Sequence, residues 1–81
     1  MDIDEAIEEV ESGALRFDRL VNICTQVFGE PRTNASHVIF RTPWAGDPRV
    51  NLQRGKDGKA KPYQVRQVLN ALRRLKGSES G

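Results

Sequence analysis

The sequence predicts an α+β domain in which helices cover one face of a small antiparallel sheet. Three observations lead to this prediction. Apolar residues recur at helical spacing over residues 17–28 and 62–76, residues 36–42 and 49–53 alternate as strands do, and a turn-forming segment rich in proline and glycine joins the two alternating runs. With 81 residues, the chain is long enough for one hydrophobic core.

The charges divide the chain into two parts. Residues 1–12 contain six carboxylates and no base, so this segment carries a charge of −6, whereas the remaining residues carry +8. An acidic leader therefore precedes a basic domain. A basic domain favours an anionic partner, and nucleic acid is the first candidate.

Composition excludes several classes of protein. The apolar runs are too short for a transmembrane helix or the core of a signal peptide. A single cysteine excludes an internal disulfide and a cysteine-rich zinc site, and a single histidine excludes a histidine-based metal cluster. We therefore expect a cytoplasmic protein that needs no cofactor.

The acidic leader, residues 1–13, is predicted to form a short helix. Asp2 can cap its N-terminus with Glu5 as its capping-box partner, Ala6 and Val10 fall on one face, and Gly13 ends it. A helix of this length is not stable in isolation. It must dock on the rest of the chain or fray.

The second predicted helix spans residues 17–28 and ends at Gly29, a typical residue after a helix C-terminus. Its apolar stripe consists of Phe17, Leu20, Val21, Cys24, Val27 and Phe28. Because Cys24 lies on this stripe, it is interpreted as a small buried apolar residue rather than a reactive thiol.

Residues 36–42 and 49–53 are predicted to pair as a hairpin, and residues 30–33 to add a short third strand. Alternation places His37 and Arg41 on one face of the sheet. Trp44 lies in the turn, where three roles are open: stacking on a base, anchoring a protein partner, or packing over the acidic helix.

A basic loop, residues 54–61, precedes the last helix, which begins at Pro62 and is expected to end at Lys76 before a disordered tail, residues 77–81. Its lysines are Lys56, Lys59 and Lys61. Cations are unfavourable at a helix N-terminus, so this arrangement favours a bound phosphate. The alternative is a solvated loop whose lysines only maintain solubility. Tyr63, beside the loop, either contacts nucleic acid or packs at the start of the helix.

His37 is the candidate for acid–base chemistry, because an imidazole titrates near neutral pH. RNA cleavage needs a base for the 2′-hydroxyl, an acid for the leaving 5′-oxygen, and cations for the charge on phosphorus. His37 with Arg41, Lys59 and Lys61 supplies such groups. The alternative is a histidine that only satisfies a hydrogen bond on the open sheet face.

Over residues 15–76 the chain resembles the HicA family, the RNA-cleaving toxins of type II toxin–antitoxin pairs. The resemblance rests on the helix ending in Gly29, on residues 35–41, and on the step from Lys59 through Pro62 into residues 65–69. The family features that this sequence keeps are Ser36, His37, Phe40, Arg41, Pro62, Arg66 and Leu69.

This resemblance implies an α-β-β-β-α fold similar to a double-stranded RNA-binding domain, spanning residues 14–76. It implies metal-independent cleavage of mRNA with His37 as the catalytic group, and a HicB-type antitoxin as protein partner. The candidate RNA- and phosphate-binding residues are Lys56, Lys59, Lys61, Arg41, Arg66 and Trp44.

Three departures from the family pattern bear on function. Ala35 replaces a glycine, Val38 stands where many members have a second histidine, and two segments are atypical, the insertion Pro43–Pro48 and the acidic leader. Two roles are open for the leader: it lies over the basic face, in which case its removal should tighten RNA binding, or it shapes the antitoxin interface. Two alternatives to the nuclease are a non-catalytic RNA- or protein-binding module of the same fold, and an interaction domain whose acidic helix pairs with the basic body of another subunit.

Overall fold

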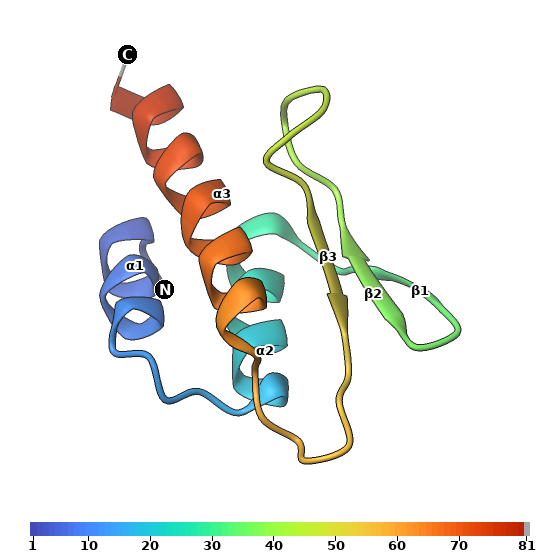
Figure 1. The fold of residues 1–81 in the computed structure, drawn as a ribbon. Helices are drawn as coiled ribbons and strands as arrows, with labels where there is room; N and C mark the ends of the chain where they lie inside the picture. The colour runs from blue at the N-terminus through green and yellow to red at the C-terminus, as the bar shows by residue number, and fades with distance from the viewer. Residues whose placement is uncertain (81) are drawn as a thin grey trace.

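The fold is described here from a computed structural model, which describes residues 1–80 of the chain. Three helices and three strands follow one another along the sequence (Figure 1). They are α1 (Ile3–Glu11), α2 (Phe17–Phe28), β1 (Arg32–Asn34), β2 (His37–Phe40), β3 (Val50–Gln53) and α3 (Pro62–Ser80). The predicted α+β class is confirmed, with two N-terminal helices, an antiparallel sheet and a C-terminal helix.

The sheet has the order β1-β2-β3, with both neighbouring pairs antiparallel. The predicted hairpin is therefore confirmed, with His37 opposite Gln53 and Phe40 opposite Val50. The short third strand is also confirmed; it begins two residues later and ends one residue later than the sequence indicates. In the tight turn between β1 and β2, Ala35 has a φ of 55°. Glycine adopts this left-handed conformation at lower cost, which accounts for the glycine expected at this position.

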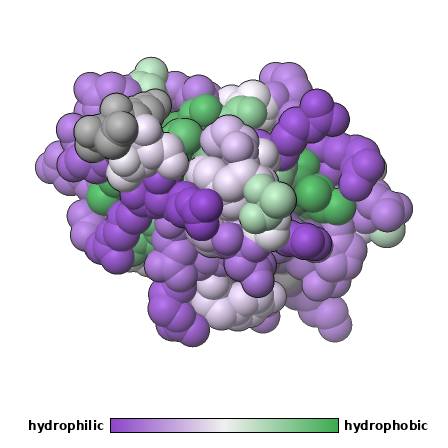
Figure 2. All heavy atoms as spheres, turned by 90° about the horizontal axis from the view of Figure 1, so that it is seen from above, coloured by the Kyte–Doolittle hydropathy of each residue, from purple (hydrophilic) through white to green (hydrophobic). Residues whose placement is uncertain are grey.

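The core lies between the helices and the inner face of the sheet (Figure 1). Phe40, Val50 and Leu52 fill it from the sheet, and apolar residues of all three helices complete it. The helical members are Ala6, Val10, Phe17, Leu20, Ile23, Cys24, Val68, Ala71 and Leu72. The face seen in Figure 2 is mostly hydrophilic, with apolar side chains showing only in small separate patches.

Helix α1 is part of this core and does not fray. Its predicted cap is confirmed, since the backbone N–H of Glu5 donates to the carboxylate of Asp2 over 2.8 Å, and this bond holds the pKa of Asp2 below its usual value. Ala6 and Val10 are completely buried. The helix packs against α2 and most extensively against α3.

Ion pairs also attach α1 to the other two helices. Glu9 binds Arg19 of α2 through both carboxylate oxygens, which lowers the pKa of Glu9 and raises the pKa of Arg19. On α3, Arg73 and Lys76 bind acidic residues of α1 over 2.8 and 2.6 Å. The carboxylates of α1 thus neutralise the bases on this side of the helical layer.

The basic loop, residues 54–61, is fastened to the start of α2 by two backbone hydrogen bonds. The N–H of Phe17 donates to the carbonyl of Gly58, and the N–H of Ala60 donates to the carbonyl of Leu15, each over 3.0 Å. Gly58 has a φ of 71°, and a Cβ there would lie 2.8 Å from the guanidinium of Arg16. These bonds hold the backbone of the loop, and with it the positions from which its lysine side chains extend.

Helix α3 continues through Ser80, beyond the end at Lys76 that the sequence indicates. Gly77 and Ser78 lack high helix propensity, but a helix already four turns long adds residues without a new nucleation step. The last residue of the expected tail, Gly81, lies outside the described residues.

Candidate active site

His37 opens β2 and lies on the outer face of the sheet, away from the core. Its side chain is half-buried, and its Nδ1 lies 3.0 Å from Oδ1 of Asn51 on β3. When Nδ1 carries the proton and donates to this amide oxygen, Nε2 has a free lone pair. The ring is thus oriented by a neighbour and retains a nitrogen that can accept a proton.

Val38, where a second histidine occurs in the HicA pattern, faces the other way. Successive side chains of a strand point to opposite faces, and Val38 packs against the hydrophobic core. A histidine at this position would be directed into the core. Within this chain, only residue 37 of the pair reaches the outer face.

A hollow lined by lysines begins at Gln53, the residue of β3 directly opposite His37. Gln53, the cross-strand partner of His37, lines it together with the basic loop. Its volume is about 560 Å³, and the other lining residues are Arg54, Gly55, Lys56, Asp57, Lys61 and Tyr63. We call it the lysine hollow. Two of the three lysines that the sequence singles out thus line a hollow that starts at the residue opposite His37, and His37 itself is not among the residues that line it.

The carboxylate in the lysine hollow, that of Asp57, is hydrogen-bonded within its own loop. It accepts the backbone N–H of Lys59 over 3.0 Å. This hydrogen bond, with the charges of Lys61 and Lys59, lowers the pKa of Asp57. Among the side chains that the structure describes, no carboxylate forms an ion pair with Lys56 or Lys61, so both ammonium groups are available to an anion.

Gln64 shapes the junction of the hollow, the sheet and α3, and the sequence pattern does not reveal it. Although polar, it is 1% exposed. Its amide oxygen accepts the N–H of Lys61 over 3.1 Å, and its amide nitrogen donates to the carbonyl of Gln53 over 2.6 Å. The amide oxygen thus binds the N–H of the residue before Pro62, as the glutamine of a capping box does, and the amide nitrogen ties α3 to the free edge of β3. A glutamine two residues after a proline at a helix start is a capping signal.

Replacing Gln64 with leucine is expected to destabilise the fold by about 1–3 kcal/mol, because a buried carbonyl and a buried N–H lose their partners. Urea unfolding followed by circular dichroism measures this loss. Asn70→Ala, an exposed change on the same helix, serves as the control and should have little effect. Equal stability of the two variants would contradict the role given to Gln64.

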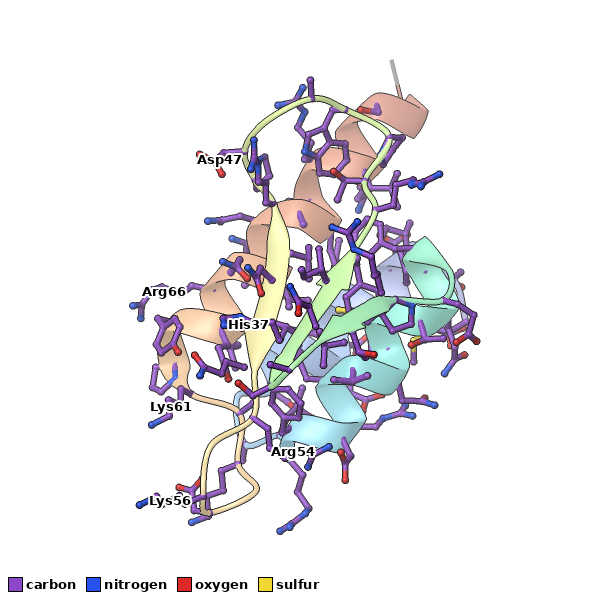
Figure 3. The ribbon with its side chains drawn as sticks, turned by 90° about the vertical axis from the view of Figure 1, so that its right-hand side faces the viewer. His37, Asp47, Arg54, Lys56, Lys61 and Arg66 are labelled. Carbon is purple, nitrogen blue, oxygen red and sulfur yellow. The ribbon has the colours of Figure 1, made fainter. Side chains whose placement is uncertain are left out.

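Arg66 lies in a second hollow, adjacent to the first along α3. This hollow has a volume of about 340 Å³ and is lined by Asp47, Pro48, Arg49, Tyr63, Arg66, Gln67 and Asn70. We call it the arginine hollow. Gln67 also accepts the backbone N–H of Asn51 over 3.0 Å, so it connects this hollow to the strand residue that orients His37. Figure 3 shows Lys61 and Arg66 projecting on the side of the molecule where His37 lies.

Two other predicted site residues, Arg41 and Lys59, line hollows other than the lysine hollow. Arg41 follows the far end of β2, about 13 Å along the strand, and lines a separate hollow with Phe28 and Arg32. The backbone of Lys59 forms an isolated antiparallel β-bridge with the backbone of Arg16. Lys59 lines a different hollow, together with residues 13–16. Sequence alternation finds the face of a strand correctly but not how far apart two residues on that face lie.

Trp44 folds back onto the helical layer, but not over the acidic helix. Its ring meets Phe28 edge-on, with centroids 6.4 Å apart, and Arg74 of α3 lies 5.1 Å above it. The indole N–H donates to the carbonyl of Pro48 over 2.9 Å. Of the three roles left open by the sequence, packing within the chain is the one that these contacts satisfy.

The acidic helix does not cover the basic face. Figure 1 shows α1 and the sheet on opposite sides of α3, and among the described side chains the ion pairs of α1 join it to α2 and α3. Of the two roles open for the leader, lying over the basic face is therefore not the one that the structure shows. The apolar residues of α1 pack on α2 and α3. This packing places the carboxylates of α1 beside bases of the same two helices.

Cys24 is buried among apolar side chains, as predicted, and this burial raises the pKa of its thiol to about 12. The ordinary value is 9.0, so the fraction of reactive thiolate near neutral pH falls about 1,000-fold. Within residues 1–80, no group of three or more histidine, cysteine or acidic side chains has the geometry to hold a metal ion.

We expect the native protein to resist alkylation of Cys24 by iodoacetamide at pH 8 and the urea-unfolded chain to react readily. Because the folded pKa is the higher one, the thiol's contribution to stability is complete below pH 9 and is lost as the pH rises towards 12. Mass spectrometry of the alkylated protein measures the reaction. Rapid modification of the folded chain would contradict the burial of this thiol.

Searches with this chain found no matching family model, no matching characterised protein and no matching solved structure. Among the described residues, no helix is long and apolar enough to cross a membrane.

Proposed function

We propose that this chain is a HicA-like endoribonuclease that cleaves mRNA in the cytoplasm without a metal ion. One observation carries the proposal: the imidazole of His37, on the open face of the sheet, lies one cross-strand position from a hollow lined by Lys56 and Lys61. The order α2-β1-β2-β3-α3 agrees with the double-stranded-RNA-binding-domain-like fold that the resemblance implies, and supports the same proposal.

In the proposed reaction, the 2′-oxygen of a ribose attacks the adjacent phosphorus, and the bond between phosphorus and the 5′-oxygen breaks. Nε2 of His37 accepts the proton of the 2′-hydroxyl, while Asn51 holds the other ring nitrogen. The leaving 5′-oxygen takes up a proton, so the products are a 2′,3′-cyclic phosphate and a 5′-hydroxyl. The proton that the 5′-oxygen takes up comes from water, and the imidazolium returns the proton of the 2′-hydroxyl to water. The imidazole is therefore regenerated, and only RNA is consumed.

The cations of the two hollows have distinct roles in this proposal. Lys56 and Lys61 contact the phosphate that reacts and stabilise the negative charge that develops on its oxygens. Arg66, in the arginine hollow, contacts the backbone further along the strand. Arg54 has a structural role, since it pairs with Asp18 and lies 4.8 Å above the ring of Phe17.

The proposed protein partner is a HicB-type antitoxin that covers the outer face of the sheet. This face holds His37 and its neighbours on β3, so a protein bound there blocks access of RNA to the imidazole. Co-expression tests this partner: toxicity of the chain should be relieved by the antitoxin, and relief should be lost when the two proteins fail to bind.

One observation favours a second candidate, a non-catalytic RNA-binding module of the same fold. Position 38 faces the core, so the chain offers RNA one imidazole and no second histidine to protonate the leaving group. A module of this kind would bind RNA through the same hollows and leave it intact.

End-labelled RNA incubated with the protein in EDTA separates the two functions. The nuclease produces fragments that end in a cyclic phosphate, whereas the module retards the RNA in a gel without shortening it. Binding of either kind must weaken as salt rises, because phosphate contacts release counterions. Absence of salt-dependent RNA binding contradicts both and favours the interaction domain.

A further inference from the structure

The two hollows beside His37 share one residue, Tyr63. It lines the lysine hollow with Lys56 and Lys61, and it lines the arginine hollow with Arg49 and Arg66. Tyr63 therefore stands between two groups of cations on one continuous surface.

The ring of Tyr63 is exposed to a degree that packing does not explain. Its exposed fraction is 52%, and among the described residues Met1, at the chain start, is the other large apolar side chain classed as exposed. Phe17 and Phe40 are buried, and Trp44 packs against Phe28. The interpretation that Tyr63 packs at the helix start therefore does not hold.

Residues of α3 continue the surface away from Tyr63. Gln67 and Asn70 follow at intervals of four and three residues, which places all three on one side of the helix over about 10 Å. That length corresponds to a few nucleotides of an extended strand. The surface thus alternates cations, an aromatic ring and amide groups, which are the elements that bind phosphates, base faces and base edges.

We propose that Tyr63 is a stacking platform for an unpaired base, and that the substrate of this chain is single-stranded RNA. This inference rests on the proposed RNA-directed function. The backbone on one side of the stacked base is held by Lys56 and Lys61, and on the other side by Arg49 and Arg66. In a duplex both faces of each base are covered by neighbours, so an exposed ring gains nothing from it.

The carboxylates in the two hollows do not reverse the charge of this surface. Asp57 is bound to a backbone N–H of its own loop, and Asp47 lines the arginine hollow together with two arginines, Arg49 and Arg66. Each hollow retains a net positive charge. The charge and the ring together fit a polyanion that carries unpaired bases.

The test measures binding of 2′-O-methyl RNA of about 12 nucleotides, which lacks the hydroxyl needed for cleavage, as a single strand and as a duplex. Fluorescence anisotropy gives Kd at several salt concentrations. We expect Tyr63→Leu to weaken single-strand binding about 5- to 150-fold, the range for loss of one stacked base. Tyr63→Phe should bind as the unaltered protein does, because it keeps the ring.

Two controls distinguish stacking from charge. Tyr63→Leu removes no phosphate contact, so the slope of log Kd against log salt should stay unchanged, whereas Lys61→Gln should reduce this slope by about 1. Duplex binding should be weaker for the unaltered protein and insensitive to Tyr63→Leu. Equal single-strand affinity of Tyr63→Leu and the unaltered protein, or a preference for the duplex, overturns the inference.

A cleavage assay with ordinary RNA separates this inference from the proposed nuclease. Binding that depends on Tyr63 but leads to no cleavage overturns the nuclease and supports the stacking site. Cleavage that is unaffected by Tyr63→Leu supports the nuclease and overturns the stacking site.

Discussion

Replacing His37 with alanine is expected to slow RNA cleavage by about 10²–10⁴-fold, the range for loss of a positioned acid–base group. The imidazole of His37 is the general base of the proposed reaction, and the sequence contains no second histidine. Its nearest side-chain contact, Asn51, is an amide and cannot take over this role. Single-turnover rates with saturating protein measure the effect on the chemical step.

Fold and binding should survive this substitution. His37 lies outside the hydrophobic core, and the lysines proposed to hold the phosphate belong to the basic loop. The melting temperature and the affinity for 2′-O-methyl RNA should therefore remain close to those of the unaltered protein. A variant that has lost binding together with cleavage would contradict the division of roles between imidazole and lysines.

Arg41→Ala is the matched control on the same strand and the same face. Arg41 lines a different hollow, remote from the lysine hollow, so its loss should change the cleavage rate by no more than about threefold through the general field. If Arg41→Ala slows cleavage as much as His37→Ala does, Arg41 belongs to the active site, as the sequence predicts.

Deleting residues 1–12 is expected to lower the melting temperature by about 15 °C or more, or to prevent folding. The deletion removes two completely buried residues, Ala6 and Val10, and exposes the faces of α2 and α3 that they cover. A small domain has little stability to lose, and each 1 kcal/mol corresponds to about 4–8 °C. Thermal unfolding followed by circular dichroism measures the change.

A conservative change in α1 separates burial from charge. Asp4→Asn removes an exposed ion pair with Lys76 and keeps the apolar face, so the melting temperature should change by no more than about 2 °C. RNA affinity of the truncated chain should not exceed that of the intact chain. A truncated chain that folds normally and binds RNA more tightly would restore the view of α1 as a cover over the basic face.

The sequence pattern predicted the regular elements well because their signals are local. The cap at Asp2, the stop at Gly29 and the start at Pro62 each depend on residues within one helical turn, and all three are confirmed. The alternation of residues 36–42 and 49–53 gave the hairpin and the outward position of His37. These features follow from backbone geometry that neighbouring residues determine.

The residues that were missed depend on packing between distant segments. Ile23 lies off the predicted stripe of α2 yet is completely buried, because α2 packs against both α1 and the sheet and needs a wider apolar face. Gln64 is buried because the free edge of β3 meets α3 there. Neither contact is encoded in a periodic pattern.

The candidate site was predicted in part for the same reason. Lys56 and Lys61 line a hollow that starts beside His37 because the hairpin register sets Gln53 opposite His37 and the basic loop follows Gln53 directly. A backbone β-bridge with Arg16 holds Lys59 at a different hollow. The ring of Trp44 packs against Phe28 and Arg74. Such contacts between separate segments decide which members of a basic sequence share one surface.

Rescue of His37→Gly by free imidazole tests the central claim most directly. The glycine leaves a space beside Asn51 that imidazole can enter, and the basic loop remains intact to bind the RNA. We predict that added imidazole restores cleavage of labelled RNA in EDTA by this variant, at the same phosphodiester bonds, and does not restore it in Lys61→Gln. If His37→Gly cleaves RNA as fast as the unaltered protein without imidazole, the imidazole takes no part in the reaction and the account is contradicted.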